Sequence, residues 1–136
     1  VSPKWSTNVN YAYTNAIIDK EADNSAFNGK TNPMTSKHNI SASVIYGLSD
    51  NASITLTQKY RSSAFAEEDY TNTATQKQKA YNSTDFNFSY SPNEELEFNF
   101  DVENLFENSY GTLLRADVIY PGNFTRNINA SLSYKF

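Results

Sequence analysis

Six stretches of the chain alternate between apolar and polar residues with a period of two. In the last of them, Ile128, Leu132 and Tyr134 share one face, and Asn and Ser residues occupy the other. A period of two indicates a β-strand with one apolar and one polar face. No 3.6-residue apolar stripe accompanies these stretches, so no helix is predicted. The predicted strands are residues 4–17, 38–47, 51–62, 82–90, 94–104 and 127–136.

The connections between these strands are of two kinds that alternate along the chain. Two are tight polar turns, "LSDN" at 48–51 and "SPNE" at 91–94, whereas 18–37, 63–81 and 105–124 are long polar loops. Short and long connections alternate in this way when consecutive strands are antiparallel and the short turns share one end, as in transmembrane β-barrels. The predicted fold is therefore all-β, an antiparallel up-and-down meander of about six strands.

The composition of the two faces favours a membrane barrel over a soluble one. The polar face is rich in Asn, Ser and Thr, which suits a hydrated lumen, and the apolar face carries aromatic residues at the strand ends. Aromatic girdles on either side of an apolar band are typical of barrels in the outer membrane. A soluble barrel or sandwich has the same alternation and remains the alternative. The aromatic residues concerned are Trp5, Tyr46, Tyr90 and Tyr134 at the short-turn end, and Tyr13 and Tyr60 at the loop end.

Bulk composition narrows the function classes. Aromatic residues make up 15% of the 136 residues although the mean hydropathy is −0.66, so the apolar surface is arranged in thin stripes. The net charge is −4 and no cluster of Lys and Arg occurs, which argues against nucleic-acid binding. There is no cysteine, and no apolar run is long enough for a transmembrane helix.

The number of strands indicates that the chain is one part of a larger barrel. A membrane barrel needs at least about eight strands, and open sheet edges are unfavourable in lipid. The first residue is Val1, without an initiator methionine or a signal peptide. We therefore expect residues 1–136 to be the C-terminal segment of a transmembrane β-barrel, with the earlier strands outside it.

Two motifs near the C-terminus resemble a known family. "VENLFENSY" at 102–110 and "YPGNFTRNINASLSYKF" at 120–136 are similar to the C-terminal end of TonB-dependent outer-membrane receptors. The family usually has an Arg directly after the Pro-Gly pair, whereas this chain has Asn123 there and Arg126 further on. The segment through Gly29, Pro33 and His38 also resembles the family. The matching motif residues are Asn104, Leu105, Phe106, Glu107, Tyr110, Pro121 and Gly122.

The resemblance implies a function in transport rather than catalysis. It implies a barrel of about 22 strands with a plug domain in its lumen, located in the bacterial outer membrane, that imports a scarce ligand such as a ferric siderophore, haem or cobalamin. The implied partners are outer-membrane lipid, the rest of the barrel and plug, an inner-membrane energy-transducing TonB-type protein, and the barrel-assembly machinery. No cofactor is implied. The implied assembly signal comprises Ile128, Leu132, Tyr134 and Phe136.

Candidate ligand-binding residues are few. Phe65, Tyr70 and Tyr120, together with Phe27, are loop aromatics that offer a stacking surface to a flat ligand, or else serve to fold the loops. Their position in long loops, where receptors often recognise ligands, is the reason for considering them.

Polar side chains give weaker candidates. His38 is the only histidine, and a lone histidine without partners more often marks the start of a strand than a metal site. Glu67, Glu68 and Asp69 offer carboxylates for a cation, but such a run is more often a solvated loop tip. The charged residues of the polar face are expected to pair across strands and stabilise the wall; they are Lys59, Arg61, Asp85, Glu97 and Asp101.

Enzymatic activity is not expected, because an outer-membrane lipase would need a Ser-His pair and His38 has no partner that the spacing identifies. Two other functions remain open. One is a structural or adhesive outer-membrane barrel, and the other is a soluble β-sandwich that serves as a binding module.

Overall fold

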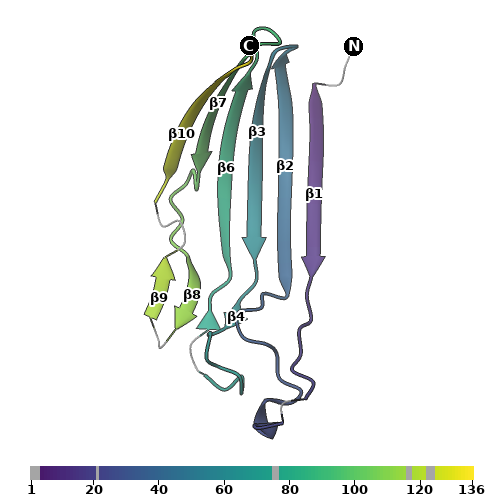
Figure 1. The fold of residues 1–136 in the computed structure, drawn as a ribbon, viewed down its shortest axis with the longest axis vertical. Helices are drawn as coiled ribbons and strands as arrows, with labels where there is room; N and C mark the ends of the chain where they lie inside the picture. The colour runs from purple at the N-terminus through teal and green to yellow at the C-terminus, as the bar shows by residue number, and fades with distance from the viewer. Residues whose placement is uncertain (1–3, 21, 75–76, 116–117, 122–124) are drawn as a thin grey trace.

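The strands form one antiparallel sheet (Figure 1). A computed structural model describes residues 4–20, 22–74, 77–115, 118–121 and 125–136. The sheet has six strands in the order β1-β2-β3-β6-β7-β10, so neighbours in sequence are neighbours in space once the short strands of the loops are set aside. The six strands are β1 (Trp5–Tyr13), β2 (His38–Ser49), β3 (Ala52–Arg61), β6 (Tyr81–Tyr90), β7 (Leu96–Glu103) and β10 (Asn127–Tyr134).

The register of the sheet keeps apolar residues beside apolar residues. Phe88 of β6 lies opposite Ile54 of β3 and Phe100 of β7, and Trp5 of β1 lies opposite Tyr46 of β2. Because successive side chains point to opposite faces, this register gathers the apolar residues on one face and the Asn, Ser and Thr residues on the other. The predicted all-β meander is therefore confirmed, and we call its two sides the apolar face and the polar face.

The sheet is a single layer, and much of its apolar face is exposed, although Val102 of β7 is buried. Val9 in the middle of β1 and Leu132 in β10 are each 69% exposed. In a soluble sandwich these residues would pack against a second sheet. The strands β1 and β10 form the two edges of the sheet.

The two tight turns lie side by side at one end of the sheet, as predicted (Figure 1). Ser91 donates its backbone N–H to the carbonyl of Asn51 at 2.8 Å, and the Asn51 side chain donates to the carbonyl of Pro92. These bonds tie the β2–β3 turn to the β6–β7 turn. The C-terminus lies at the same end.

The first predicted strand was too long, because β1 ends at Tyr13 rather than at Ile17. The residues that follow pair with a loop instead of with β2. Ile17 forms an isolated antiparallel bridge with Thr31, and Asn32 donates its N–H to the carbonyl of Ala16 at 2.9 Å. The clean alternation stops in this segment, where Asn15 falls on the apolar side, and the hydrogen-bonding partner changes as well.

The opposite end of the sheet carries the loop tier, which we define as the described parts of residues 14–37, 62–80 and 104–126 (Figure 1). The second and third of these segments were predicted as plain loops, yet they contain short strands. The short elements are η1 (Ser25–Phe27), β4 (Ala64–Phe65) paired with β5 (Lys77–Gln78), and β8 (Gly111–Arg115) paired with β9 (Val118–Pro121).

Most of the buried side chains lie in the loop tier rather than in the sheet. Leu114 is 1% exposed, and Ala64, Asp69 and Gln78 are also buried. The tier is held together by hydrogen bonds such as that from the Glu67 N–H to the Leu114 carbonyl at 2.9 Å. Among the described residues, no helix is both long and apolar enough to cross a lipid bilayer.

Candidate functional site

The polar face is cross-linked by side-chain bonds between neighbouring strands. Lys59 of β3 forms an ion pair with Asp85 of β6 at 2.5 Å, which confirms the predicted cross-strand pairing for these two residues. The Asn87 side chain donates to Asp101 at 2.8 Å, so Asp101 pairs with an amide rather than with a cation. These bonds stiffen the wall between β3 and β7.

Two other charged residues predicted to take part in this pairing do not join it. Glu97 accepts a hydrogen bond from Asn99 at 2.9 Å, next to it on the same strand. Arg61 forms no ion pair with any other residue that the structure describes. Of the five charged residues predicted to pair across strands, only Lys59 and Asp85 form an ion pair with each other in the described part of the chain.

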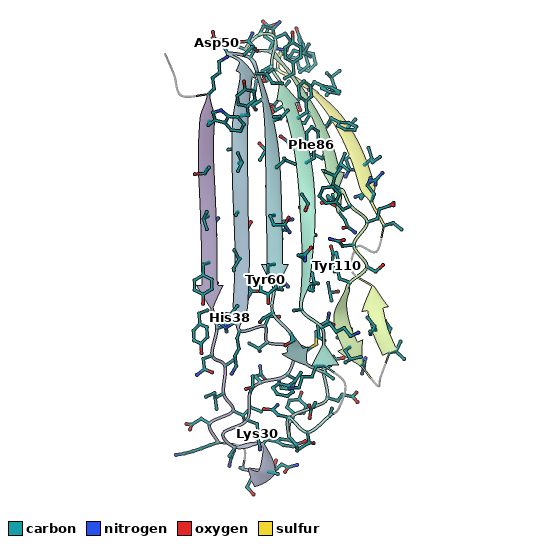
Figure 2. The ribbon with its side chains drawn as sticks, turned by 180° about the vertical axis from the view of Figure 1, so that it is seen from behind. Lys30, His38, Asp50, Tyr60, Phe86 and Tyr110 are labelled. Atoms are coloured by element: carbon teal, nitrogen blue, oxygen red, sulfur yellow. The ribbon has the colours of Figure 1, made fainter. Side chains whose placement is uncertain are left out.

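A hollow of about 320 Å³ lies on the polar face where β3 and β6 approach the loop tier. The rings of Tyr81 and Tyr110 stack in parallel at its edge, with their centroids 4.3 Å apart. Figure 2 shows Tyr110 at this level, beside the end of β6. The hollow combines both signs of charge with aromatic and hydroxyl groups; its lining includes Lys59, Arg61, Tyr81, Asp85, Glu103 and Tyr110.

Asn104, the first residue of the family-like motif, organises the turn after β7. It is 1% exposed and has a positive φ of 52°, a left-handed conformation that Asn tolerates better than most residues. Its side chain donates to the Asn108 carbonyl and accepts from the Asn108 N–H, at 3.1 and 3.0 Å. Its own N–H donates to Asp85 at 3.0 Å. The motif therefore has a structural reason for its asparagine.

Two further residues of the motif contact Arg126, which directly precedes β10. The Arg126 guanidinium donates to the Leu105 carbonyl at 3.0 Å and lies 3.8 Å from the Glu107 carboxylate. Phe106 is exposed. Arg126 thus contacts the motif although it does not directly follow the Pro-Gly pair. Pro121 ends β9, whereas Gly122 lies outside the described residues.

Aromatic residues gather at both ends of the apolar face. At the short-turn end Trp5 packs on Tyr46 with ring centroids 4.3 Å apart, and Tyr134 meets Phe136 edge to face at 5.3 Å. At the loop end the Tyr11 hydroxyl hydrogen-bonds to His38 at 2.9 Å. Figure 2 shows His38 where β2 meets the loop tier, so this histidine marks the start of a strand and is held by an aromatic neighbour.

The loop aromatics named as ligand candidates have separate surroundings. Phe65 lies under the Lys77 ammonium, which is 4.2 Å from the ring centroid. Tyr70 stacks on Phe27 at 5.2 Å. Tyr120 on β9 is 45% exposed. The contact between Phe27 and Tyr70 joins two loops of the tier, which corresponds to the structural role considered for these residues.

The acidic run at 67–69 does not converge on a cation site. Asp69 is buried and accepts hydrogen bonds from the N–H groups of Thr73 and Ala74, at 2.9 and 3.1 Å. Glu67 and Glu68 both lie near the Arg115 guanidinium, at 3.4 and 3.5 Å. No group of three metal-ligating side chains occurs among the described residues. Sequence reasoning missed Arg115, since nothing local places β8 beside this loop.

A family model decides what kind of barrel this sheet comes from. The model described as "TonB dependent receptor-like, beta-barrel" matches residues 2–105. The chain belongs to this TonB-dependent receptor family. The match includes five of the six sheet strands and ends at Leu105, so most of the C-terminal motifs lie beyond it.

Solved structures of receptors and transporters extend the likeness over nearly the whole chain. The unliganded ferric citrate transporter FecA has a TM-score of 0.79 and 25% sequence identity, over 98% of this chain. The siderophore receptor PiuA from Acinetobacter baumannii gives 0.77 and 18% over 100%. The closed form of the ferric-catecholate import receptor Fiu from E. coli K12 gives 0.75 and 22% over 100%. The two lower identities establish the fold alone.

The chain spans about a fifth of the length of these receptors, with 21%, 20% and 19% of each covered. Their names describe receptors and transporters, in line with the family model. A comparison with curated protein sequences found no match.

Proposed function

We propose that this chain is the C-terminal wall of an outer-membrane receptor that imports a scarce ligand with energy from a TonB-type protein of the inner membrane. The observation that carries the proposal is the uncovered apolar face, bounded by aromatic residues at both ends, in a chain that belongs to the TonB-dependent receptor family. A face of this kind matches the lipid-facing band of a transmembrane barrel.

In this proposal the polar face lines the lumen and the loop tier lies outside the cell. The unpaired edge of β10 then pairs with the first strand of the barrel, and the edge of β1 pairs with the strand that precedes it. The plug domain and the earlier strands lie N-terminal to residue 1. The alternative of a soluble sandwich is disfavoured because Val9 and Leu132 are not covered by a second layer.

We propose a metal chelate such as a ferric siderophore as the ligand. The names of the similar structures support this class, since they refer to ferric citrate, a siderophore and a ferric catecholate. Phe65, Tyr70 and Tyr120 remain candidate contacts in the loop tier. Haem and cobalamin are the alternatives that an uptake assay separates from the iron chelates.

The test is uptake by cells that carry the complete receptor. A panel of radiolabelled ferric citrate, ferric catecholate, ferric hydroxamate, haem and cobalamin is supplied to the parent strain and to a strain lacking the receptor. We expect the receptor-dependent uptake of one compound to stop when a protonophore removes the energy source. Uptake that is the same in both strains for every compound would count against transport and favour a structural or adhesive barrel.

The proposed assembly signal has its own test. Phe136 is fully exposed at the chain end and contacts Tyr134 edge to face, in line with Leu132 and Ile128 on the apolar face. We expect Phe136→Ala to lower the amount of heat-modifiable receptor in the outer membrane, with Lys135→Ala on the polar face as the matched control. Equal amounts of assembled receptor in the two variants would exclude this role.

A further inference from the structure

A second hollow, of about 290 Å³, lies where β2 and β3 enter the loop tier. It is formed by the first loop on one side and by the β4–β5 hairpin on the other. Two contacts fix these parts relative to each other: Met34 donates its N–H to the Phe65 carbonyl at 3.0 Å, and His38 donates its N–H to the Ser62 hydroxyl at 3.0 Å. The hollow is therefore formed before any ligand arrives, as ligand sites usually are.

The charged groups that line this hollow are cationic. Lys37 and Lys77 contribute two ammonium groups, and no Asp or Glu belongs to the lining. Neither lysine forms an ion pair with another described residue. The charge of the lining is therefore positive, whereas the net charge of the whole chain is −4. Two ammonium groups at one hollow, with no carboxylate among the lining residues, favour an anionic partner.

The Lys77 ammonium is already positioned. It lies over the Phe65 ring, 4.2 Å from the centroid, which is the arrangement of a cation–π contact. Phe65 in turn belongs to β4, which pairs with β5, the strand that carries Lys77. A side chain held in this way loses less conformational freedom when it binds a ligand than a free surface lysine does.

Hydroxyl groups complete the set of donors around the hollow. Thr31 and Ser63 belong to the lining, whereas the hydroxyl of Thr35, also in the lining, donates to the Pro33 carbonyl. The Ser62 hydroxyl accepts the N–H of His38, so its own hydrogen is available to donate. Ammonium and hydroxyl donors together suit carboxylate or phosphate oxygens, with the charge-assisted bonds contributing most of the affinity.

We propose that this hollow binds the anionic oxygen group, carboxylate or phosphate, of a small ligand arriving from outside the cell, with Lys37 and Lys77 as the charged contacts. The proposal rests on the proposed function only in placing the loop tier outside the cell. It extends that function by giving the first contact a charge requirement: the ligand class is a negatively charged chelate rather than a neutral one.

The experiment uses the complete receptor in phosphatidylcholine nanodiscs, with citrate and inorganic phosphate as probes in separate calorimetric titrations. We expect saturable binding of at least one anion, weakened at least about tenfold in the double variant Lys37→Gln/Lys77→Gln, because both charge-assisted bonds are lost. The matched control is Lys135→Gln, at the opposite end of the sheet. Lys77→Arg keeps a positive charge that can stack on Phe65 and is expected to bind the anion more tightly than the double variant does.

Two results would overturn the proposal: no saturable binding of either anion to the parent receptor, or the same affinity in the double variant and in the Lys135→Gln control. Heat-modifiability of each variant shows that the barrel is assembled before the titration. Lipopolysaccharide is then added to the nanodiscs. Weaker citrate binding after this addition assigns the anion to a lipid phosphate, and unchanged binding assigns it to a soluble chelate.

The binding assay and the uptake assay test the two proposals separately, so one proposal can be refuted while the other is supported. Anion binding that depends on the two lysines, in a receptor that transports nothing from the panel, would support the anion site and refute the transport function. Transport of a neutral ferric hydroxamate at the same rate by the parent and the double variant, without anion binding, would support transport and refute the site.

Discussion

The six-stranded sheet and the loop tier place their apolar side chains in opposite environments. In the sheet, Val9 and Leu132 on the apolar face are exposed, and Val102 is the buried exception. In the loop tier, Leu114 is 1% exposed and Ala64 is also buried. Ala64 lies shortly before Glu67, which the neighbour of Leu114, Arg115, contacts. The tier has a small core of its own, whereas the sheet depends on its surroundings for burial. The loop tier is therefore stabilised by burial within the chain, and the sheet by burial against whatever surrounds it.

The largest expected effect concerns a charge placed in the apolar face. Val9 lies midway along β1, between Trp5 and Tyr13. We expect Val9→Arg to destabilise the receptor in lipid vesicles by about 2–4 kcal/mol, the cost of an arginine near the bilayer midplane. The control Asn10→Arg places the same charge on the polar face of the same strand and is expected to change the free energy of unfolding by less than about 1 kcal/mol. Urea titration measures both, and equal costs would remove the distinction between the two faces.

The second largest effect is expected from a cavity in the core of the loop tier. Leu114→Ala leaves a cavity beside the 63–80 loop and is expected to destabilise the tier by about 2–3 kcal/mol, at the low end for a buried leucine because loops can relax. Hydrogen exchange should accelerate at Glu67, whose N–H bonds to the Leu114 carbonyl. Exchange in the sheet should stay as it is. Val118→Ala, at an exposed position of the same hairpin, is the control; acceleration throughout the sheet would mean that the two regions unfold together.

A smaller effect is expected where the two regions meet, at Asn104. Asn104→Ala removes the side-chain bonds to Asn108 and leaves a residue with a Cβ at positive φ, so we expect a loss of about 1–2 kcal/mol. Asn104→Gly loses the same bonds but relieves the backbone, and should be milder. Protease cleavage within 105–110 reports the difference. A glycine variant as sensitive as the alanine variant would show that the hydrogen bonds alone hold the turn.

The sequence predicted the sheet well and the loop tier poorly, for a physical reason. A strand with one apolar face repeats its signal every two residues, so β2, β3, β6, β7 and β10 were located to within a few residues. The β4–β5 pair has two residues in each strand and no alternation to detect. The overlong first strand has a different cause, because the alternation weakens after Tyr13, where Asn15 falls on the apolar side, and the partner changes there from β2 to a loop.

The contacts of the candidate residues were likewise predictable in the sheet and not predictable in the loop tier. Lys59 and Asp85 were predicted to pair because adjacent strands and a shared face determine their proximity. The bonds of Asp69 to its own loop, and the approach of Arg115 to Glu67, depend on how loops fold over one another. The contact of Lys77 with the Phe65 ring also depends on how the loops fold. No periodicity in the sequence indicates which distant loop residue will be its neighbour.

The antiparallel ladder between β7 and β10 also has a mechanical meaning. Its register runs from Asn127 opposite Glu103 to Tyr134 opposite Leu96, with the hydrogen bonds perpendicular to both strands. A force along β10 loads all of these bonds at once, whereas a force across the strand breaks them one after another. The terminal strand therefore resists being pulled lengthwise but peels away from Phe136 inwards. Within the described sheet β10 is an edge strand, so such a force acts on its bonds to β7 alone.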